Sequence, residues 1–290
     1  MDSSFNASRI FESAVGKLSG TYEKEEAAAN VRWLMEEILG FSRVDIAMQK
    51  PQTNGEKALQ EFRLALKRLS TGEPIQYVLG YSEFLGNKYL VNPFVLIPRP
   101  ETEELVMKIV QDNPTATSLL DIGTGSGCIA ISLAQALKHA SVEASVEAWD
   151  IDNGALDVAT RNARNLGVMV QFEQVDALGY WPDRGERLDL IVSNPPYITA
   201  QEKQVMRPNV LDHEPAKALF VPNDNPLLFY REISQKSRAY LSEGGKLYFE
   251  INENFGEAVV KLLQEMKYKG VKLHKDFQDK PRMVEAYWPG

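Results

Sequence analysis

The sequence predicts an α/β protein in which a small helical region is followed by a parallel sheet with helices on both faces. Apolar residues recur at helical spacing from about Asn6 to about Ser70, and no strand pattern interrupts them. From Ser118 onward, short apolar strand patterns alternate with helical patterns, as they do in parallel sheets. The 290 residues therefore contain two regions of different structural class.

The helical region has three segments with the apolar spacing of amphipathic helices, RIFESAVGKL, EKEEAAANVRWLMEEILG and GEKALQEFRLALKRLS. The second segment ends on Gly40, which suits a helix C-cap because glycine adopts positive φ at little cost. A stretch rich in Gly, Pro and aromatic residues follows, with β-like runs at 88–91 and 94–97. We expect a connector that carries a β-hairpin and ends in a new helix at about Glu101.

The sheet region alternates strand and helix patterns in the order SLLDIG, CIAISLAQAL, SVEAWDI, GALDVATRNARNLG, MVQFEQVDA and LDLIVSN. Each strand pattern is short and apolar, as expected for a strand that is buried on both faces. The polar residues that end these strands should therefore meet at one edge of the sheet, where open α/β sheets bind ligands.

Composition limits the classes of function. The formal net charge is −8 with a pI near 5.1, which argues against broad binding to nucleic-acid phosphates. The single cysteine, Cys128, excludes an internal disulfide or a cysteine-cluster metal site and suits a reducing compartment. The first residues, MDSSFNASRI, show no signal-peptide pattern, and no apolar run approaches the ~18 residues that cross a bilayer. We expect a cytoplasmic protein.

A glycine-rich turn follows the first strand of the sheet, in LLDIGTGSGCIAISLA. Gly123, Gly125 and Gly127 would let a ligand approach bare backbone just before a helix that opens at about Cys128. The residues from Gly125 to Ala130 fit the G-x-G-x-x-A pattern of dinucleotide binding. The three alternating glycines equally fit the looser loop of adenosylmethionine-dependent methyltransferases, and a tight turn without a ligand is the third reading.

Two acidic residues end the next two strands. Asp150 would lie beside the glycine turn and accept hydrogen bonds from a ribose diol, with Ile151 packing on an adenine face. Asp152 is better placed than Asp150 to cap the following helix, which leaves Asp150 for a ligand. Asp176 could bind the adenine amino group or could simply be a turn residue. NAD and adenosylmethionine both carry a ribose, so these residues do not separate the two cofactors.

The stretch DLIVSNPPYI places a rigid corner directly after a core strand. Two prolines cannot continue a sheet, and they fix the backbone so that a main-chain carbonyl can point the same way as the side-chain carbonyl of Asn194. Two acceptors side by side would hold an NH2 group by both hydrogens, with Tyr197 offering a flat face. Such a clamp would hold a planar nitrogen in line with a methyl donor and stabilise its developing charge. The corner therefore predicts N-methylation, with a purely structural turn as the alternative.

An Asn-Pro-Pro-Tyr corner in this position is typical of amino-methyltransferases that act on adenine in nucleic acids or on glutamine in proteins. Over nearly its whole length, the chain resembles the release-factor glutamine methyltransferases, the HemK/PrmC family. The matching stretches are GEPIQYVLGYSEFLG, VLIPRPETEELV, HEPAKALF, FYREI, GGKLYFEI and KDFQDKPRMV.

The resemblance implies a small all-helical N-terminal domain at 1–78 that docks the substrate, a β-hairpin linker at 79–100 and a seven-stranded Rossmann-like methyltransferase domain at 101–290. It implies methyl transfer from S-adenosyl-L-methionine to the side-chain amide nitrogen (N5) of the glutamine in the Gly-Gly-Gln motif of class I peptide-chain release factors. We expect a monomer without direct nucleic-acid binding, a bound metal or a membrane segment.

The resemblance also implies the site residues. The cofactor would contact Gly123, Thr124, Gly125, Ser126, Gly127, Asp150, Ile151, Asp176, Ala177 and Asn194. The glutamine amide would be held by Asn194, Pro195, Pro196 and Tyr197, which are also the catalytic candidates. Two positions depart from the family pattern. Ala177 replaces a common aromatic residue, so Tyr180 or Trp181 would cover the adenine, or nothing would. Residues 250–254 differ from the usual Glu-Ile-Gly and Gln, which puts the role of this segment in doubt.

Other candidates have competing interpretations. Glu101 and Glu103 either favour the start of a helix or line the cofactor pocket. His213 and Glu214 resemble a metal pair, but no third ligand stands at a plausible spacing, and a structural or substrate-facing loop is the favoured interpretation. Two other functions remain open, an adenine N6-methyltransferase acting on DNA or RNA and a catalytically silent scaffold that binds adenosylmethionine.

Overall fold

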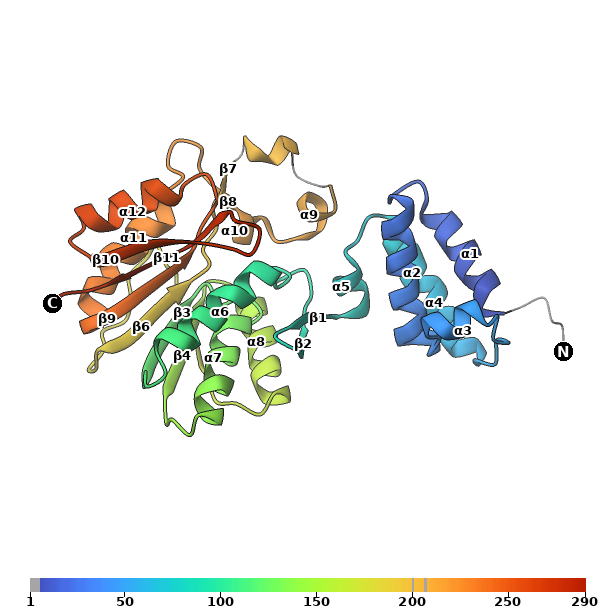
Figure 1. Cartoon of the computed structure of the whole chain (residues 1–290), viewed down its shortest axis with the longest axis horizontal. Helices are drawn as coiled ribbons and strands as arrows, with labels where there is room; N and C mark the ends of the chain where they lie inside the picture. Colours follow the sequence, from blue (N-terminus) through green and yellow to red (C-terminus); the bar gives the residue numbers. More distant parts are fainter. Residues whose placement is uncertain (1–5, 200, 206–207) are drawn as a thin grey trace. The chain divides into compact units, whose positions relative to one another are not determined.

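The computed structural model describes residues 6–199, 201–205 and 208–290, and these form two compact units (Figure 1). One unit contains the described residues up to Gly80 together with the short helix α9 (Pro208–His213). The other contains the remaining described residues from Tyr81 onward. Residues 1–5, the start of the stretch without a signal-peptide pattern, lie outside the described residues. No helix in the described part of the chain is both long and apolar enough to span a membrane.

The first unit is helical, and its three predicted helices are confirmed. Its elements up to Gly80 are α1 (Ala7–Leu18), α2 (Lys24–Leu39), α3 (Arg43–Ala47), α4 (Glu56–Ser70) and α5 (Ile75–Leu79). Gly40 ends α2 with φ of 67°, and its N–H donates to Glu36 O, so the predicted C-cap is confirmed. Leu18, Leu34 and Leu69 are fully buried where α1, α2 and α4 pack together, which gives this unit its own core.

The β-hairpin lies earlier in the connector than the sequence pattern predicted. Its strands are β1 (Tyr81–Phe84) and β2 (Asn87–Leu90), paired antiparallel, so the predicted strand at 94–97 is wrong. The turn between them places Leu85 and Gly86 at positive φ. A leucine in a sequence does not indicate this conformation. The 94–97 run does not pair because Asn92 and Pro93 begin a turn, in which the Asn92 side chain accepts from Phe94 N at 3.0 Å.

The second unit is built on a seven-stranded sheet, as the resemblance implied. Along the sheet the order is β10 (Lys269–Lys275), β11 (Pro281–Tyr287), β9 (Leu241–Glu250), β6 (Leu188–Ser193), β3 (Ser118–Ile122), β4 (Ser145–Asp150) and β5 (Gln171–Gln174). The five strands from β9 to β5 are parallel, and β10 and β11 run antiparallel at one edge. The chain order reverses at β3, whose neighbours are β4 and β6, so the carboxyl ends of these three strands border a crevice suited to a ligand.

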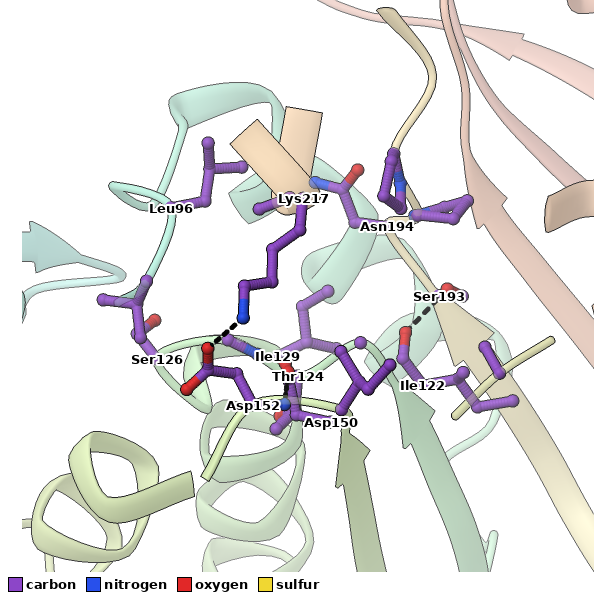
Figure 2. Close-up of a pocket in the computed structure, with 18 of the residues that line it drawn as sticks. Leu96, Ile122, Thr124, Ser126, Ile129, Asp150, Asp152, Ser193, Asn194 and Lys217 are labelled. Carbon is purple, nitrogen blue, oxygen red and sulfur yellow. Dashed lines mark hydrogen bonds and ion pairs between the residues drawn. The ribbon is translucent and has the colours of Figure 1, made fainter. Parts of the chain in front are cut away.

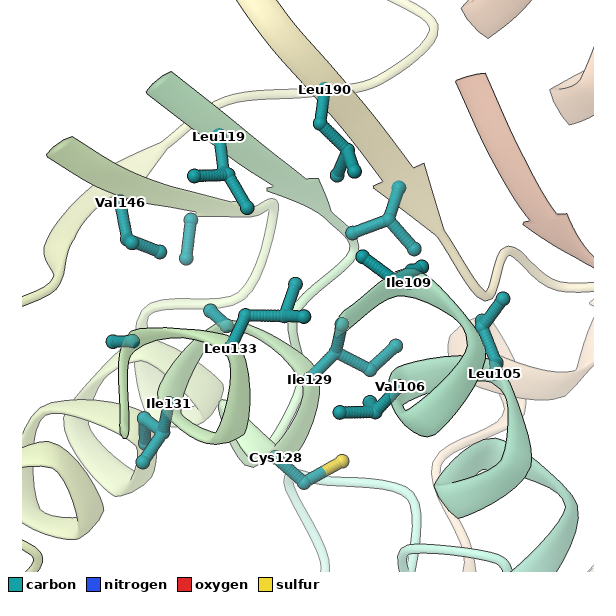
Figure 3. Packing of buried hydrophobic residues seen from close by; sticks show 14 of the residues in the cluster. Leu105, Val106, Ile109, Leu119, Cys128, Ile129, Ile131, Leu133, Val146 and Leu190 are labelled. Atoms are coloured by element: carbon teal, nitrogen blue, oxygen red, sulfur yellow. The ribbon is translucent and has the colours of Figure 1, made fainter. Parts of the chain in front are cut away.

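Helices cover both faces of this sheet (Figure 1). The helices α6 (Pro100–Asp112), α7 (Cys128–His139) and α8 (Asn153–Asn165) pack on one face, where their apolar residues meet those of β3, β4 and β6 (Figure 3). On the other face lie α11 (Leu228–Tyr240) and α12 (Gly256–Glu265). Strand residues alternate between the two cores, Leu119 joining the first and Leu120 the second, which fixes the direction of each strand-end side chain.

The chain after β6 forms small elements before it returns to the sheet. These are β7 (Ile198–Thr199), the 3₁₀ helix η1 (Glu202–Val205), α10 (Ala216–Leu219) and β8 (Phe220–Val221). The strands β7 and β8 pair in parallel, with Ile198 opposite Phe220. This pairing holds α10 beside the carboxyl edge of the sheet, where its Lys217 lines the cavity described below.

Candidate active site

A cavity of about 330 Å³ opens at the carboxyl ends of β3, β4 and β6, and all its lining residues belong to the second unit (Figure 2). This volume lies within the range of small-molecule sites. Eleven of the residues predicted from the sequence line it together: Gly123, Thr124, Gly125, Ser126, Asp150, Ile151, Asp176, Ala177, Asn194, Pro195 and Pro196. The cavity does not include Gly127 or Tyr197.

The glycine loop presents bare backbone to the cavity at two of its three glycines. Gly123 and Gly125 have φ of 75° and 54°, and a Cβ added to either would meet nothing within 4 Å. Gly127 has φ of 81°, but a Cβ there would lie 2.7 Å from Ile131 Cδ1 and 3.1 Å from Ala159 Cβ. The first two glycines therefore leave space for a ligand, whereas Gly127 allows the loop to pack on α7 and α8.

Asp150 ties the loop to the end of β4. Its Oδ2 accepts from Gly125 N and its Oδ1 accepts from Asp152 N, both at 2.9 Å. Burial raises the pKa of the Asp150 carboxyl, which these backbone donors partly oppose. Asp152 is the N-cap of α8, as predicted, and accepts from Gly154 N and Ala155 N. Each Asp150 oxygen has one of its lone pairs left over, so the carboxylate retains capacity for a hydroxyl donor in the cavity.

Asp176 and Ala177 line the cavity beyond β5, where Asp176 also has the role of a turn residue. Its Oδ1 accepts from Leu178 N at 2.8 Å, and its main-chain oxygen accepts from Gly179 N at 3.0 Å. The turn-residue interpretation is therefore confirmed, and binding of an adenine amino group by Asp176 stays a prediction.

The structure favours the alternative in which neither Tyr180 nor Trp181 covers the adenine. Tyr180 is 79% exposed, and neither residue lines the cavity. Trp181 is buried instead, with its ring 5.2 Å from Trp149 and 5.1 Å from Tyr240 in edge contacts, and its Nε1 donates to Ala177 O. Large apolar area drives Trp181 into the core. The apolar side chains that do line the cavity include Ile129, Ile151, Leu178, Phe229 and Ile233.

The corner after β6 divides between the cavity and the core. Asn194, Pro195 and Pro196 line the cavity, and the Asn194 Nδ2 donates to Thr102 Oγ1 at 3.4 Å. The Tyr197 ring turns away into the apolar cluster under α11 and α12. Burial, followed by the nearby Glu250 carboxylate, raises the pKa of the Tyr197 hydroxyl. Tyr197 therefore supports the corner from behind, and does not offer its face to a ligand as the sequence analysis expected.

Residues 250–254, whose role the sequence left in doubt, hold this corner. Glu250 ends β9 and is buried, and its carboxylate accepts from Thr102 Oγ1 at 2.6 Å and from Tyr197 OH at 3.3 Å. Asn252 donates to Tyr197 O at 3.3 Å and to Glu202 Oε1 at 3.0 Å. These bonds join β9, η1 and the corner into one partly buried network.

Sequence reasoning missed several lining residues, among them Arg99, Thr102 and Lys217. Arg99 makes an ion pair with the buried Glu214 at 2.7 Å, so this carboxylate has a cationic partner within the chain. Lys217 makes an ion pair with Asp152 beside the glycine loop (Figure 2). All three lie in stretches that match the family, but no local pattern indicates that they face a cavity.

Glu101 and Glu103 are not among the lining residues. The carboxylate of Glu103 accepts from Leu85 N at 2.8 Å and so joins α6 to the turn of the β1–β2 hairpin. In the first turn of α6, Thr102 faces the cavity. Successive residues of a helix point in different directions, so the neighbouring Glu101 and Glu103 face elsewhere.

Comparisons with known proteins match both units. A model of the PrmC N-terminal domain matches residues 10–80, and a model of the methyltransferase small domain matches residues 101–218. The chain is 45% identical over 269 residues to the release factor glutamine methyltransferase of Bacteroides thetaiotaomicron, covering 93% of this chain and 95% of that one. It is 40% identical to the protein of the same name from Flavobacterium psychrophilum, covering 94% and 95% of the two chains. A methyltransferase structure from Pyrococcus furiosus, 17% identical, superposes with a TM-score of 0.50 over 70% of this chain and 89% of that chain, a likeness of fold.

Proposed function

Because the chain belongs to the family of release factor glutamine methyltransferases, we propose that it methylates the side-chain amide nitrogen (N5) of the glutamine in the Gly-Gly-Gln motif of class I release factors. The methyl donor is S-adenosyl-L-methionine. The observation that carries this proposal is that Asn194, Pro195 and Pro196 line the same cavity as the glycine loop and Asp150. The proposed amide clamp and the proposed nucleoside site would thus share one space.

The residues present suit this cofactor. The open sides of Gly123 and Gly125 leave room against the backbone, and Asp150 offers the acceptors that a ribose diol needs. Ile151, Leu178 and Phe229 supply apolar surface for a purine ring. When bound, adenosylmethionine supplies an electrophilic methyl group carried on a sulfonium.

The chain's own contribution is to hold and orient the glutamine amide. The Asn194 Oδ1 and the main-chain carbonyl of Pro195 would each accept one hydrogen of the NH2 group, which leaves the nitrogen lone pair free to face the methyl group. Both acceptors also stabilise the positive charge that develops on nitrogen during transfer. The methylated nitrogen is strongly acidic and loses a proton to water, so the clamp needs no neighbouring general base.

We also propose roles for the rest of the chain. The helical domain, 1–78, would dock the release factor, and 79–100 would link it to the methyltransferase domain, 101–290. Gly127 and Tyr197 would then act by supporting the loop and the corner, since both pack away from the cavity. The enzyme would work as a cytoplasmic monomer without direct nucleic-acid binding, for which the net charge of −8 is a supporting argument.

The test is transfer of labelled methyl groups from adenosylmethionine to a purified release factor, with its Gly-Gly-Gln glutamine changed to Ala as a control and duplex DNA as a competing substrate. We expect label on the intact factor alone. Label on DNA would favour adenine N6-methylation, and cofactor binding without label on any substrate would favour a scaffold. Either result would overturn the proposal.

A further inference from the structure

We propose that Thr102 is a positioning residue that sets which way round the Asn194 amide lies, and that the buried Glu250 keeps Thr102 in this role. The inference rests on the proposed function, because the group that Asn194 would receive is the glutamine amide. It assigns a task to two residues that the sequence analysis did not place in the site.

The three side chains come from parts of the chain that are distant in sequence, and Thr102 contacts both of the others. Thr102 lies in the first turn of α6 and is 2% exposed, Glu250 ends β9, and Asn194 follows β6. The Thr102 Oγ1 lies 2.6 Å from Glu250 Oε2 and 3.4 Å from Asn194 Nδ2. The bonded residues are 148 and 92 positions apart in the sequence, so only the fold brings these side chains together.

The direction of these bonds follows from the donor inventory. While Glu250 is ionised, its carboxylate has only acceptors, so the one hydroxyl proton of Thr102 points at it. The Thr102 oxygen can then offer Asn194 nothing but a lone pair, and only the NH2 end of the Asn194 amide can approach a lone pair. The Oδ1 end must therefore face the other way, toward the cavity, where the proposed clamp needs an acceptor.

The two orientations of the amide differ in chemistry more than in shape. With the amide reversed, Oδ1 would face the lone pairs of Thr102 and the NH2 group would face the NH2 of the substrate. That arrangement loses one hydrogen bond at each end of Asn194, and leaving such groups unpaired away from water is unfavourable. The Thr102–Glu250 pair therefore prepares the acceptor before the substrate binds.

The groups around Glu250 decide when it is ionised. Tyr197 donates to its carboxylate from the corner, and Arg282 on β11 is the nearby cation. Glu101 on α6 is a nearby anion, and the Tyr230 hydroxyl of α11 and the Cys128 thiol of α7 also lie close. Burial raises the pKa of Glu250, and the bond from Thr102 opposes this rise. Protonation of Glu250 would release the hydroxyl of Thr102, so the rate of transfer should fall on the acid side.

The first experiment compares Thr102→Val, which keeps the shape but removes the hydroxyl, with Thr102→Ser, which restores the hydroxyl. The control is Ser132→Ala on α7, which removes another buried hydroxyl. The Oγ of Ser132 lies 2.8 Å from the hydroxyl oxygen of Tyr89. For Thr102→Val we expect kcat to fall about 10- to 100-fold, with the KM for the release factor and the cofactor Kd changed less than about 2-fold. Thr102→Ser should retain kcat within about 3-fold, and Ser132→Ala should leave it unchanged. A wild-type kcat in Thr102→Val, or an equal loss in Ser132→Ala, would overturn the inference.

The second experiment reads the orientation without catalysis. The Asn194 side-chain NH2 signals, identified by their loss in Asn194→Ala, are followed by NMR in protein labelled with nitrogen-15 at asparagine. They should shift between wild type and Thr102→Val and return in Thr102→Ser, and unchanged signals would contradict the inference. The kcat of wild type should also fall at low pH, and this acid limb should flatten in Thr102→Val. Should wild type label no release factor, the proposed function fails, while the NMR signals still decide the orientation.

Discussion

The two halves of the cavity are built in opposite ways. The proposed cofactor half is a continuous loop of backbone, and Asp150, which holds it, lies 25 residues from its partner Gly125. The proposed amide half depends on side chains from α6, the corner after β6 and the end of β9 that are 53 to 148 residues apart. One half is sensitive to atoms that are added, because it works by leaving space. The other is sensitive to atoms that are removed, because it works by keeping hydrogen bonds.

The largest effect is expected at the amide half. Asn194→Ala removes one of the two acceptors of the clamp, and loss of one such preorganised group typically lowers kcat about 10²- to 10³-fold. The cofactor Kd, measured by calorimetry, should change far less, because Asn194 is one of many residues that line the cavity. Pro98→Ala, at another lining position, serves as a control for the general shape of the cavity. Transfer at the wild-type rate in Asn194→Ala would remove the clamp from the mechanism.

The glycine loop offers a paired test of space. Gly127→Ala should lower the free energy of unfolding by about 3 kcal/mol, because a left-handed backbone and a close contact with Ile131 act together. Gly123→Ala has a similar φ but open space, so it should cost stability only about 1 kcal/mol and should mainly weaken cofactor binding. Denaturant unfolding and cofactor titration of both variants separate the two effects. Equal loss of stability in the two variants would show that Gly127 has no special packing role.

A smaller effect is expected at Asp150. Asp150→Ala should weaken cofactor binding by about 10- to 100-fold, since hydrogen bonds to a charged group contribute about 1.5–3 kcal/mol. Because burial raises the pKa of Asp150, the wild-type affinity should begin to fall at a higher pH than for an ordinary aspartate as the pH is lowered. Titration of the cofactor at several pH values tests both points. Asp176→Ala, which removes a turn residue at the next strand end, is the comparison, and a larger loss there would reverse the assignment.

The smallest effect is expected at Lys217. Lys217→Met removes the ion pair between Lys217 and Asp152. Because the lysine side chain is 60% exposed, the loss in transfer rate should correspond to at most about 1 kcal/mol. The pair with Lys217 lowers the pKa of Asp152, and salt should screen most of the difference between the two proteins. Transfer rates at low and high ionic strength test this. A loss of tenfold or more that persists in high salt would mean that Lys217 contacts a substrate.

Sequence patterns predicted the parts of this protein that depend on neighbours along the chain. The helical segments with the Gly40 cap, the alternation of strands and helices, the Asp152 cap and the loop from Gly123 follow from spacing and from local backbone chemistry. The predicted position of the hairpin was wrong because its turn holds Leu85 at positive φ, which no local sequence preference indicates.

Only the tertiary structure decided which side chains face the cavity and what holds them there. It turned Tyr197 and Trp181 into the core, brought Arg99, Thr102 and Lys217 to the cavity, and gave residues 250–254 a role behind the corner. The physical reason is that a motif fixes the chemistry and backbone of a few successive residues. The surroundings of each side chain, including whether a hydroxyl donates or accepts, are set by groups that are far away in sequence.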